Sequence, residues 1–317
     1  MIVLLGATGY LGSAFARMLE EMREPFVAIS RSQVCYTEYG PLVEYLRSVR
    51  ATFLINAAGY TGKPNVDACE QARADTLQGN TLFPLTLSHA CQSAGIPWGH
   101  VSSGCIYSGA IIEDGNCRIE PNLMTPNIRR IVESRPHAVQ GFRETDAPNF
   151  SFRQPPCSFY SGTKALAEEA LRGDERAYLW RLRIPFNEVD GPRNFLSKLQ
   201  RYPKIYDNVN SISHLGDFVR AAFELWKIAA PPGIYNITNP GWVTSREVVE
   251  LIQRKLNLDR EFQFWENDQE FYSSAVTAPR SNCVLDSSKL LATGVSLRPV
   301  NEALEHAMSH WQPERSH

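Results

Sequence analysis

Short apolar runs alternate with amphipathic stretches up to about residue 185 of the chain. Runs of four or more apolar residues predict buried strands, and apolar residues spaced three or four positions apart predict helices. The predicted strands are residues 2–5, 26–30, 53–58, 100–107 and 178–185, and the predicted helical stretches are residues 13–22, 66–94 and 161–171. This alternation predicts the α/β class, a Rossmann-type doubly wound parallel sheet with helices on both faces.

The pattern changes after about residue 190, where GPRNF, NPGW and APRSN separate shorter elements. Residues 245–256 predict a helix, with Thr244 or Ser245 as its N-cap. We therefore divide the chain into a first domain, residues 1–190, and a smaller C-terminal lobe, residues 191–317, interleaved with the last strands. Residues 108–150 are rich in Pro, Asn, Gly and charge and show little periodicity, so we interpret them as a lid or a mobile insertion.

Composition and charge narrow the range of partners. The 317 residues carry a net charge of −2, which gives no reason to expect nucleic acid or an anionic membrane surface. No run of about eighteen apolar residues predicts a membrane span, and the opening MIVLLGATG lacks the basic region and cleavage site of a signal peptide. The seven cysteines are scattered without a CxxC pair. We therefore expect reduced thiols, no metal site and a cytoplasmic protein.

Gly6, Gly9 and Gly12 lie between the first predicted strand and the first predicted helix. Gly6 permits a tight turn, Gly9 lets the backbone approach a pyrophosphate, and Gly12 allows close packing of helix on sheet. The helix N-terminus that follows favours an anion. An ordinary strand-to-helix turn is the alternative, but a glycine triplet in this position predicts dinucleotide binding.

The end of the second predicted strand, Ala28-Ile29-Ser30-Arg31, indicates which dinucleotide is bound. It lacks the acid that would bind the ribose 2′-hydroxyl of NAD, and Arg31 could pair with a 2′-phosphate. We therefore expect NADPH, with NADH as the other choice, and a surface role for Arg31 as the alternative. Residues 1–190 are thus a predicted NADP(H)-binding domain. Further cofactor contacts are expected from Thr8, Tyr10, Leu11, Ser30, Ala57, Ala58 and Gly59.

The stretch FYSGTK places Tyr160 four residues before Lys164, so that both lie on one face of the predicted helix. A nearby ammonium lowers the pKa of a phenol and prepares it to protonate a carbonyl oxygen as hydride arrives. Ser103, at the end of the preceding strand, could hydrogen-bond the same oxygen. The spacing is common on ordinary helices, but behind a glycine turn it predicts a reductase site.

These residues, with the NAAG stretch at 56–59, resemble the extended short-chain dehydrogenase/reductases. More narrowly, the chain is similar to the plant-type bifunctional nucleotide-sugar 3,5-epimerase/4-reductases, a rhamnose synthase group related to dTDP-4-dehydrorhamnose reductase. The resemblance spans nearly the whole chain. The segments that carry it are INAAGYTGKPNVDACE (55–70), SGCIY (103–107), SFYSGTKALAEE (158–169), GPRNFLSK (191–198), GIYNITNPG (233–241), APRSN (278–282) and LDSSKL (285–290).

The resemblance implies an NADPH-dependent enzyme acting on a nucleotide-diphospho-4-keto-6-deoxyhexose. It would epimerise C3 and C5 and reduce C4 to give an NDP-L-rhamnose-like sugar, and the C-terminal lobe would bind that substrate. Family members often dimerise through the helices near residues 70–95 and 161–171, so a homodimer is implied, although the residue pattern does not predict it. The longer 108–150 stretch and the GATGYLG turn depart from the family, and they leave the nucleotide and the exact sugar open.

Cys105 fits an epimerisation that precedes reduction. Inverting a carbon beside a ketone requires one group to remove a proton and another to return it from the opposite face, and a thiol suits this exchange near neutral pH. Two residues after Ser103 on a predicted strand, Cys105 would share its face. The resemblance implies Lys198 as the second acid/base. The alternatives are a buried small hydrophobe for Cys105 and a surface lysine for Lys198.

Five further side chains could meet the substrate. Lys63 and Asn65 follow the third strand, at the carboxyl edge where ligands bind in such sheets. Arg193 and Asn194 could meet the sugar or diphosphate, and Arg280 offers bidentate donors to a diphosphate. Each could instead tie loops together.

Two narrower functions and one of a different class stay open. The chain could be a C4 reductase alone, or an epimerase alone, on a related keto-sugar such as a 6-deoxyhexose or a heptose. It could also be a regulatory subunit that binds NADP(H) without turnover. The intact set of Tyr160, Lys164, Ser103 and Cys105 argues against the last.

Overall fold

The computed structural model describes residues 1–313, and these form two compact units, each assembled from three stretches of chain. Unit 1 comprises Met1–Ile106, Pro148–Arg181 and Val219–Tyr235. Unit 2 comprises Tyr107–Ala147, Leu182–Phe218 and the described residues from Asn236 onward. Residues 107–147 and 182–190 therefore pack within unit 2, whereas the sequence analysis assigned them to the first domain.

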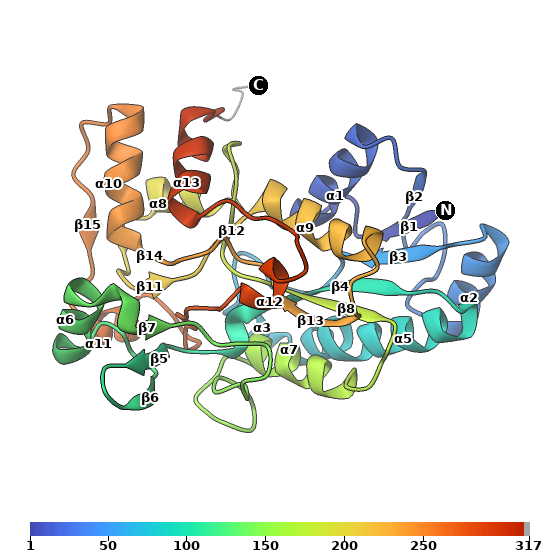
Figure 1. Ribbon diagram of the computed structural model, residues 1–317, viewed down its shortest axis with the longest axis horizontal. Coiled ribbons are helices and arrows are strands. Elements are labelled where there is room, and N and C mark those ends of the chain that lie inside the picture. The colour runs from blue at the N-terminus through green and yellow to red at the C-terminus, as the bar shows by residue number, and fades with distance from the viewer. Residues whose placement is uncertain (314–317) are drawn as a thin grey trace. The chain divides into compact units, whose positions relative to one another are not determined.

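Unit 1 is built on a parallel six-stranded sheet with the order β13-β8-β4-β3-β1-β2 (Figure 1). The predicted α/β fold with a doubly wound parallel sheet is confirmed. The strands are β1 (Ile2–Leu5), β2 (Phe26–Ile29), β3 (Phe53–Asn56), β4 (Trp98–Ser103), β8 (Ala177–Leu182) and β13 (Gly233–Asn236). The helical segments are α1 (Tyr10–Glu21), α2 (Tyr39–Ser48), α3 (Ala68–Gln71), α4 (Arg73–Leu77), π-helical η1 (Gln78–Leu82), α5 (Phe83–Ala94), 3-10 helical η2 (Gly104–Ile106), α7 (Phe159–Ala170) and α9 (Leu215–Lys227).

The central strands are mostly apolar and buried because helices cover the sheet on both faces. Every residue of β1, β3 and β8 is buried. On one face, Phe53 stacks on Trp226 of α9 with ring centroids 4.4 Å apart, and Phe15 of α1 stacks on Trp180 of β8. On the other face lie α2, α5 and α7 (Figure 1).

Unit 2 consists of helices and four small sheets. Its strands are β5 (Ala110–Glu113), β6 (Cys117–Glu120), β7 (Val139–Gln140), β9 (Pro185–Phe186), β10 (Lys204–Ile205), β11 (Val209–Asn210), β12 (Ser213–His214), β14 (Val243–Thr244) and β15 (Gln263–Phe264). Its helices are α6 (Pro126–Ser134), η3 (Pro136–Ala138), α8 (Phe195–Arg201), α10 (Ser245–Leu256), α11 (Asp268–Ser274), α12 (Ser288–Leu291) and α13 (Val300–Ser309). The apolar faces of α8, α10 and α13 share one core.

The helix predicted at 245–256 is confirmed, and its start shows how local sequence sets a boundary. The Thr244 side chain accepts a hydrogen bond from the backbone of Glu247, and the Glu247 side chain accepts one from the Thr244 backbone. This reciprocal capping box satisfies two amide groups that the helix itself cannot pair. Asn257, in the left-handed conformation, ends the helix.

Two stretches differ from what the sequence pattern indicated. The strand predicted at 100–107 is β4, which begins at Trp98 and ends at Ser103, because Gly104 turns the chain into the 3-10 helix η2. Residues 108–150 were interpreted as a lid or a mobile insertion because they show little periodicity, but they contain regular elements. They contain the antiparallel sheet β6-β5-β7 and the amphipathic helix α6, which bury their own apolar cluster together with Val209 and Val284. The strands are too short for alternation to be detected, whereas the helical spacing of Ile128, Ile131 and Val132 in α6 was present in the sequence and was missed.

No helix in the described residues is long and apolar enough to cross a membrane.

The absence of a side chain at Gly99 on β4 lets the Trp180 ring of β8 pack directly against the β4 backbone. Replacing Gly99 tests this packing. A Cβ atom at residue 99 would lie 1.8 Å from Trp180, whose ring is fixed between aromatic neighbours. We expect Gly99→Ala to lower the free energy of unfolding by about 2–3 kcal/mol, as overpacked cores do. Gly40→Ala on α2, where nothing lies within 4 Å, should instead raise it by roughly 0.5 kcal/mol. Urea unfolding measures both, and equal midpoints for the two variants would contradict this packing.

Candidate active site

The glycine turn after β1 fits a dinucleotide pyrophosphate. Gly6 has φ +79°, and the Gly9 amide donates to its carbonyl at 2.9 Å. A Cβ at Gly12 would lie 1.9 Å from the Gly6 oxygen, and a Cβ at Gly6 would lie 2.7 Å from the Ala58 amide nitrogen. The turn therefore closes tightly only because both residues are glycine. It also rests directly on the segment that follows β3.

The N-terminus of α1 is prepared for an anion. No side chain caps it, and no acidic residue lies in its first turn. The amide groups there carry partial positive charge, and Thr8 and Gly9 are exposed beside them. This turn and helix start would hold the diphosphate of a bound dinucleotide.

The loop after β2 is ordered by its own side chains. Gln33 accepts hydrogen bonds from the amide and the hydroxyl of Ser30, each at 2.9 Å, and the Ser30 and Ser32 hydroxyls lie 2.8 Å apart. Arg31 is exposed on this fixed loop. The position where a carboxylate would accept ribose hydroxyls thus carries a cation and hydroxyl groups.

Helix α7 presents Tyr160 and Lys164 on one face, and its start is fixed at two places. Ser158 caps the helix through a 3.1 Å hydrogen bond from the Ser161 amide. Glu70 of α3 accepts the Phe159 amide at 2.6 Å. A carboxylate at a helix N-terminus is favoured by the dipole, so these contacts hold the first turn, where Tyr160 lies, in place.

Lys164 is a buried cation beside the expected cofactor segment. Its Nζ donates to the carbonyl of Val101 on β4 at 3.1 Å, and a Cβ on Gly59 would lie 3.9 Å from that nitrogen. Burial lowers the pKa of Lys164 to about 8, although the nearby Cys105 and Glu168 oppose the shift. An amine with such a pKa exists in both protonation states near neutral pH.

Ser103 and Cys105 lie where β4 gives way to η2, against which α7 packs. The Ser103 Oγ accepts the Cys105 amide at 3.2 Å, which uses a lone pair of the oxygen and leaves its proton to donate. The expectation that both side chains share a strand face is wrong, because Cys105 follows the strand end. The Cys105 thiol is largely buried, at 8% exposure.

Asn80 joins the site without any signal in the sequence. It lies in the π-helical turn η1 and is fully buried. Its side chain accepts the Tyr60 amide at 2.9 Å and donates to the Tyr60 carbonyl at 2.8 Å, and its Nδ2 lies 3.4 Å from the Thr163 hydroxyl of α7. Asn80 thus fixes the segment after Gly59 next to the helix of Tyr160. Lone asparagines at irregular turns show no periodicity, so only the structure reveals it.

Lys63 and Asn65, the two substrate contacts expected after β3, are both exposed. The Asn65 carbonyl oxygen Oδ1 accepts the Asp67 amide at 2.8 Å, which gives it a role in the turn before α3. Both stay predictions as substrate ligands.

In unit 2, Lys198, Arg193 and Arg280 gather around α8. Burial, and then the charge of Arg193, lowers the pKa of Lys198. Burial raises the pKa of Tyr202, one turn after Lys198, and the charge of Arg280 opposes that shift. The loop carrying Arg280 is anchored by buried Arg183, which donates to the Ser281 carbonyl.

Asn194 has a structural role. It is fully buried, and its Nδ2 donates to Asn187 and to the Val189 carbonyl at 2.7–2.9 Å. Its Oδ1 accepts the Leu196 amide and so caps α8. This burial argues against direct contact with substrate and indicates that Asn194 shapes the loop that carries Arg193.

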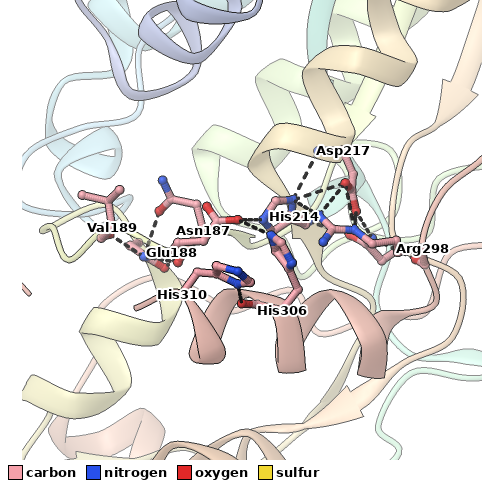
Figure 2. Close-up of polar contacts among 10 residues, drawn as sticks. Asn187, Glu188, Val189, His214, Asp217, Arg298, His306 and His310 are labelled. Atoms are coloured by element: carbon pink, nitrogen blue, oxygen red, sulfur yellow. Dashed lines mark hydrogen bonds and ion pairs between the residues drawn. The ribbon is translucent and has the colours of Figure 1, made fainter. Parts of the chain in front are cut away.

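A cluster of charged residues contacts Glu188, which lies just before the loop that carries Arg193 (Figure 2). His214 Nε2 lies 2.8 Å from Glu188, while Asp217 receives two short bonds from Arg298, at 2.7 and 3.0 Å. Glu188 and Asp217 favour a charged imidazole. However, Arg298 and the Asp217 amide both point donors at Nδ1, at 3.0 and 3.2 Å, a geometry that fits the neutral ring with its proton on Nε2.

The glycine turn, the Tyr160–Lys164 helix and the parallel sheet are the combination that defines short-chain dehydrogenase/reductases, the class to which fold and site assign this chain. Within that class, the chain belongs to the RmlD substrate binding domain family, whose model matches residues 1–312.

Named relatives share most of the chain. It is 31% identical over 306 residues to the bifunctional dTDP-4-dehydrorhamnose 3,5-epimerase/dTDP-4-dehydrorhamnose reductase of Arabidopsis thaliana, covering 95% of this chain and 90% of that protein. It is 30% identical over 303 residues to a trifunctional UDP-glucose 4,6-dehydratase/UDP-4-keto-6-deoxy-D-glucose 3,5-epimerase/UDP-4-keto-L-rhamnose-reductase of the same plant, of which it spans only 40%. The crystal structure of the L780 UDP-rhamnose synthase from Acanthamoeba polyphaga mimivirus has the same fold, with a TM-score of 0.82, 22% identity and 98% coverage of both chains.

Ionised Glu188 contributes to the stability of unit 2, and this contribution is lost at low pH. Burial opposes ionisation, but the hydrogen bond that Nε2–H of His214 donates lowers the pKa of Glu188 below its ordinary value. A depressed folded-state pKa contributes stability above the ordinary pKa of about 4.5, and this is lost as pH falls through the lowered value. We expect Glu188→Gln to lose about 1–2 kcal/mol at pH 7, a deficit that shrinks between pH 5 and pH 3.

Urea midpoints from pH 7 to pH 3 measure this effect. Glu250→Gln, at an exposed position in the middle of α10, is the control, and its urea midpoint should follow that of the wild type at every pH. A Glu188→Gln deficit that stays constant down to pH 3 would contradict the assignment.

Proposed function

We propose that the protein is an NADPH-dependent epimerase/reductase that acts on a nucleotide-diphospho-4-keto-6-deoxyhexose. It inverts C3 and C5 and reduces C4, giving an NDP-L-rhamnose-like sugar. The observation that carries the proposal is the packing of the Tyr160–Lys164 face of α7 against the end of β4, where Ser103 and Cys105 lie together.

The reduction uses three side chains of unit 1. Tyr160 protonates the C4 oxygen, Ser103 donates a hydrogen bond to it, and Lys164 favours the phenolate form of Tyr160 and contacts the nicotinamide ribose. The bound nicotinamide supplies the hydride that adds to C4. The closeness of the Lys164 Nζ to Gly59 supports a contact between Lys164 and the nicotinamide ribose, because Gly59 follows β3 at the carboxyl edge of the sheet, where ligands bind.

The epimerisation uses Cys105. The C4 ketone makes the hydrogens on C3 and C5 acidic, because Tyr160 and Ser103 stabilise the enolate oxygen. Cys105 exchanges a proton at carbon, and Lys198 of unit 2 is the proposed second acid/base. Its lowered pKa brings the amine closer to the range where it both gives and takes protons near neutral pH. Arg193 and Arg280 would hold the diphosphate.

The relatives support both halves of this reaction. The plant protein that covers 95% of this chain is named for epimerase and reductase activities together. A C4 reductase alone, or an epimerase alone, is the narrower alternative, and it would make Cys105 or the Tyr160–Lys164 pair dispensable. A non-catalytic NADP-binding subunit is disfavoured because the chain carries all of the proposed catalytic side chains.

Solvent deuterium incorporation tests the proposal. UDP- and dTDP-4-keto-6-deoxyglucose are incubated with NADPH in D₂O, and the product is read by NMR. The wild type should yield a rhamnosyl product with deuterium at C3 and C5, because protons removed there are replaced from solvent. Cys105→Ala should lose the label by at least about tenfold, in the range expected for removing an acid/base group.

The matched control is Cys69→Ala, a buried thiol near Cys105 that has no proposed role. It should retain labelling. NADPH oxidation without deuterium at either carbon would leave a plain C4 reductase and return Cys105 to a packing role. No oxidation with any keto-sugar would favour the non-catalytic subunit.

Cofactor choice is tested at Arg31. A charge-assisted bond to a 2′-phosphate contributes about 1.5–3 kcal/mol, so Arg31→Ala should lower kcat/KM for NADPH roughly 10- to 100-fold and leave that for NADH nearly unchanged. Arg17→Ala, an exposed arginine on α1, is the control. An equal loss with both cofactors would remove Arg31 from the 2′-phosphate site.

A further inference from the structure

Glu168 forms a buried charged cluster next to the proposed site. Its carboxylate accepts the Ser102 hydroxyl at 2.6 Å and three bonds from Arg181 at 2.7–3.1 Å. The side chains of Glu168 and Arg181 are only 6% and 2% exposed. Helix α7 is thereby linked to two strands of the sheet, β4 through Ser102 and β8 through Arg181.

The cluster extends the face of α7 that carries the proposed chemistry. Tyr160, Lys164 and Glu168 are spaced by four residues, so they form one row along the helix. Lys164 binds the carbonyl of Val101, Glu168 binds the hydroxyl of Ser102, and the next residue of β4 is Ser103. These two adjacent contacts fix the register of the helix on the strand end.

Glu168 also balances the charge of Lys164. The groups near the ammonium are Glu168 on its own helix, Cys105 on η2 and His100 on β4. Burial, and then the charge of Lys164, holds the pKa of His100 well below its ordinary value, so that ring is neutral. Glu168 and Cys105 oppose the effect of burial on Lys164.

A buried ion pair is weak evidence for stability, because an apolar pair of the same volume is often as stable. The neighbouring residue shows the contrast: Glu169 pairs with Arg153 on the outside of the same helix, where both side chains are exposed. Glu168 lies between the row of Tyr160 and Lys164 on α7 and the strand that ends in Ser103. This position suggests that the buried pair with Arg181 serves the site rather than the stability of the fold.

We propose that Glu168 is a positioning residue: its carboxylate locks the Tyr160–Lys164 row of α7 onto β4 and balances the buried Lys164 ammonium. Glu168 does not contact substrate. The proposal depends on the proposed function only for its kinetic readout.

The first test needs no substrate or cofactor. The protein has seven lysines, so its ε-carbons can be labelled with ¹³C and followed by NMR during a pH titration, with Lys164→Arg assigning the signal. Glu168→Gln should lower the pKa of Lys164 by about one unit, because it leaves Arg181 uncompensated nearby. Glu169→Gln, the control on the outer face, should leave it unchanged.

Glu168→Gln could fail to fold, since it isolates a buried guanidinium. Glu168→Gln/Arg181→Gln removes both charges and keeps the volume, and it should shift the Lys164 titration in the same direction by a smaller amount. The proposal would be overturned if the pKa of Lys164 in folded Glu168→Gln lay within a tenth of a unit of the wild-type value. If the single variant does not fold, the same criterion applies to the folded double variant.

The kinetic test uses the reductase assay. Lys164 must be protonated to act, so the alkaline limb of the kcat profile should move to lower pH in Glu168→Gln by the same amount as the NMR titration. A loss of kcat that is uniform across pH would indicate a structural role only and overturn the proposal. An NMR shift in a protein that reduces no keto-sugar would support the inference and contradict the proposed function instead.

Discussion

Burial of the Lys164 ammonium is the constraint around which unit 1 arranges its polar groups. A charge taken out of water needs compensation, and the structure supplies it from three directions: the Val101 carbonyl, the carboxylate one turn further along α7, and the polar end of β4. The glycines nearby serve the same arrangement, since Gly59 leaves space beside the amine. The segment after β3, the end of β4 and the helix thus meet at one cation, and the glycine turn packs against that segment.

The sequence predicted the parts of the fold in which one element carries its own signal. The fully buried runs of β1 and β3 and the capped helix α10 are examples, because continuous apolar residues and a capping box are local properties. The glycine turn and the Tyr160–Lys164 spacing are local in the same sense. Family resemblance added Lys198, which no spacing rule could find.

What the sequence could not predict depends on contacts between distant segments. Asn80 and Glu70 are an isolated amide and an isolated acid until α7 packs against them. The predicted strand ran past Ser103 to residue 107 because a glycine inside an apolar run is compatible with strand or turn, and packing decides. In residues 108–150, strands of two to four residues are too short for alternation to be detected.

The interleaving of the chain has a consequence for how the protein is made. Strand β13, at the edge of the six-stranded sheet, is formed by Gly233–Asn236, and the part of α9 that covers Phe53 precedes it by only a few residues. A nascent chain that has emerged only through β8 therefore carries an uncovered aromatic face and an unpaired sheet edge. Both are surfaces that promote aggregation. Unit 1 therefore completes its sheet only once Gly233–Asn236 has been synthesised, more than 200 residues after its first strand.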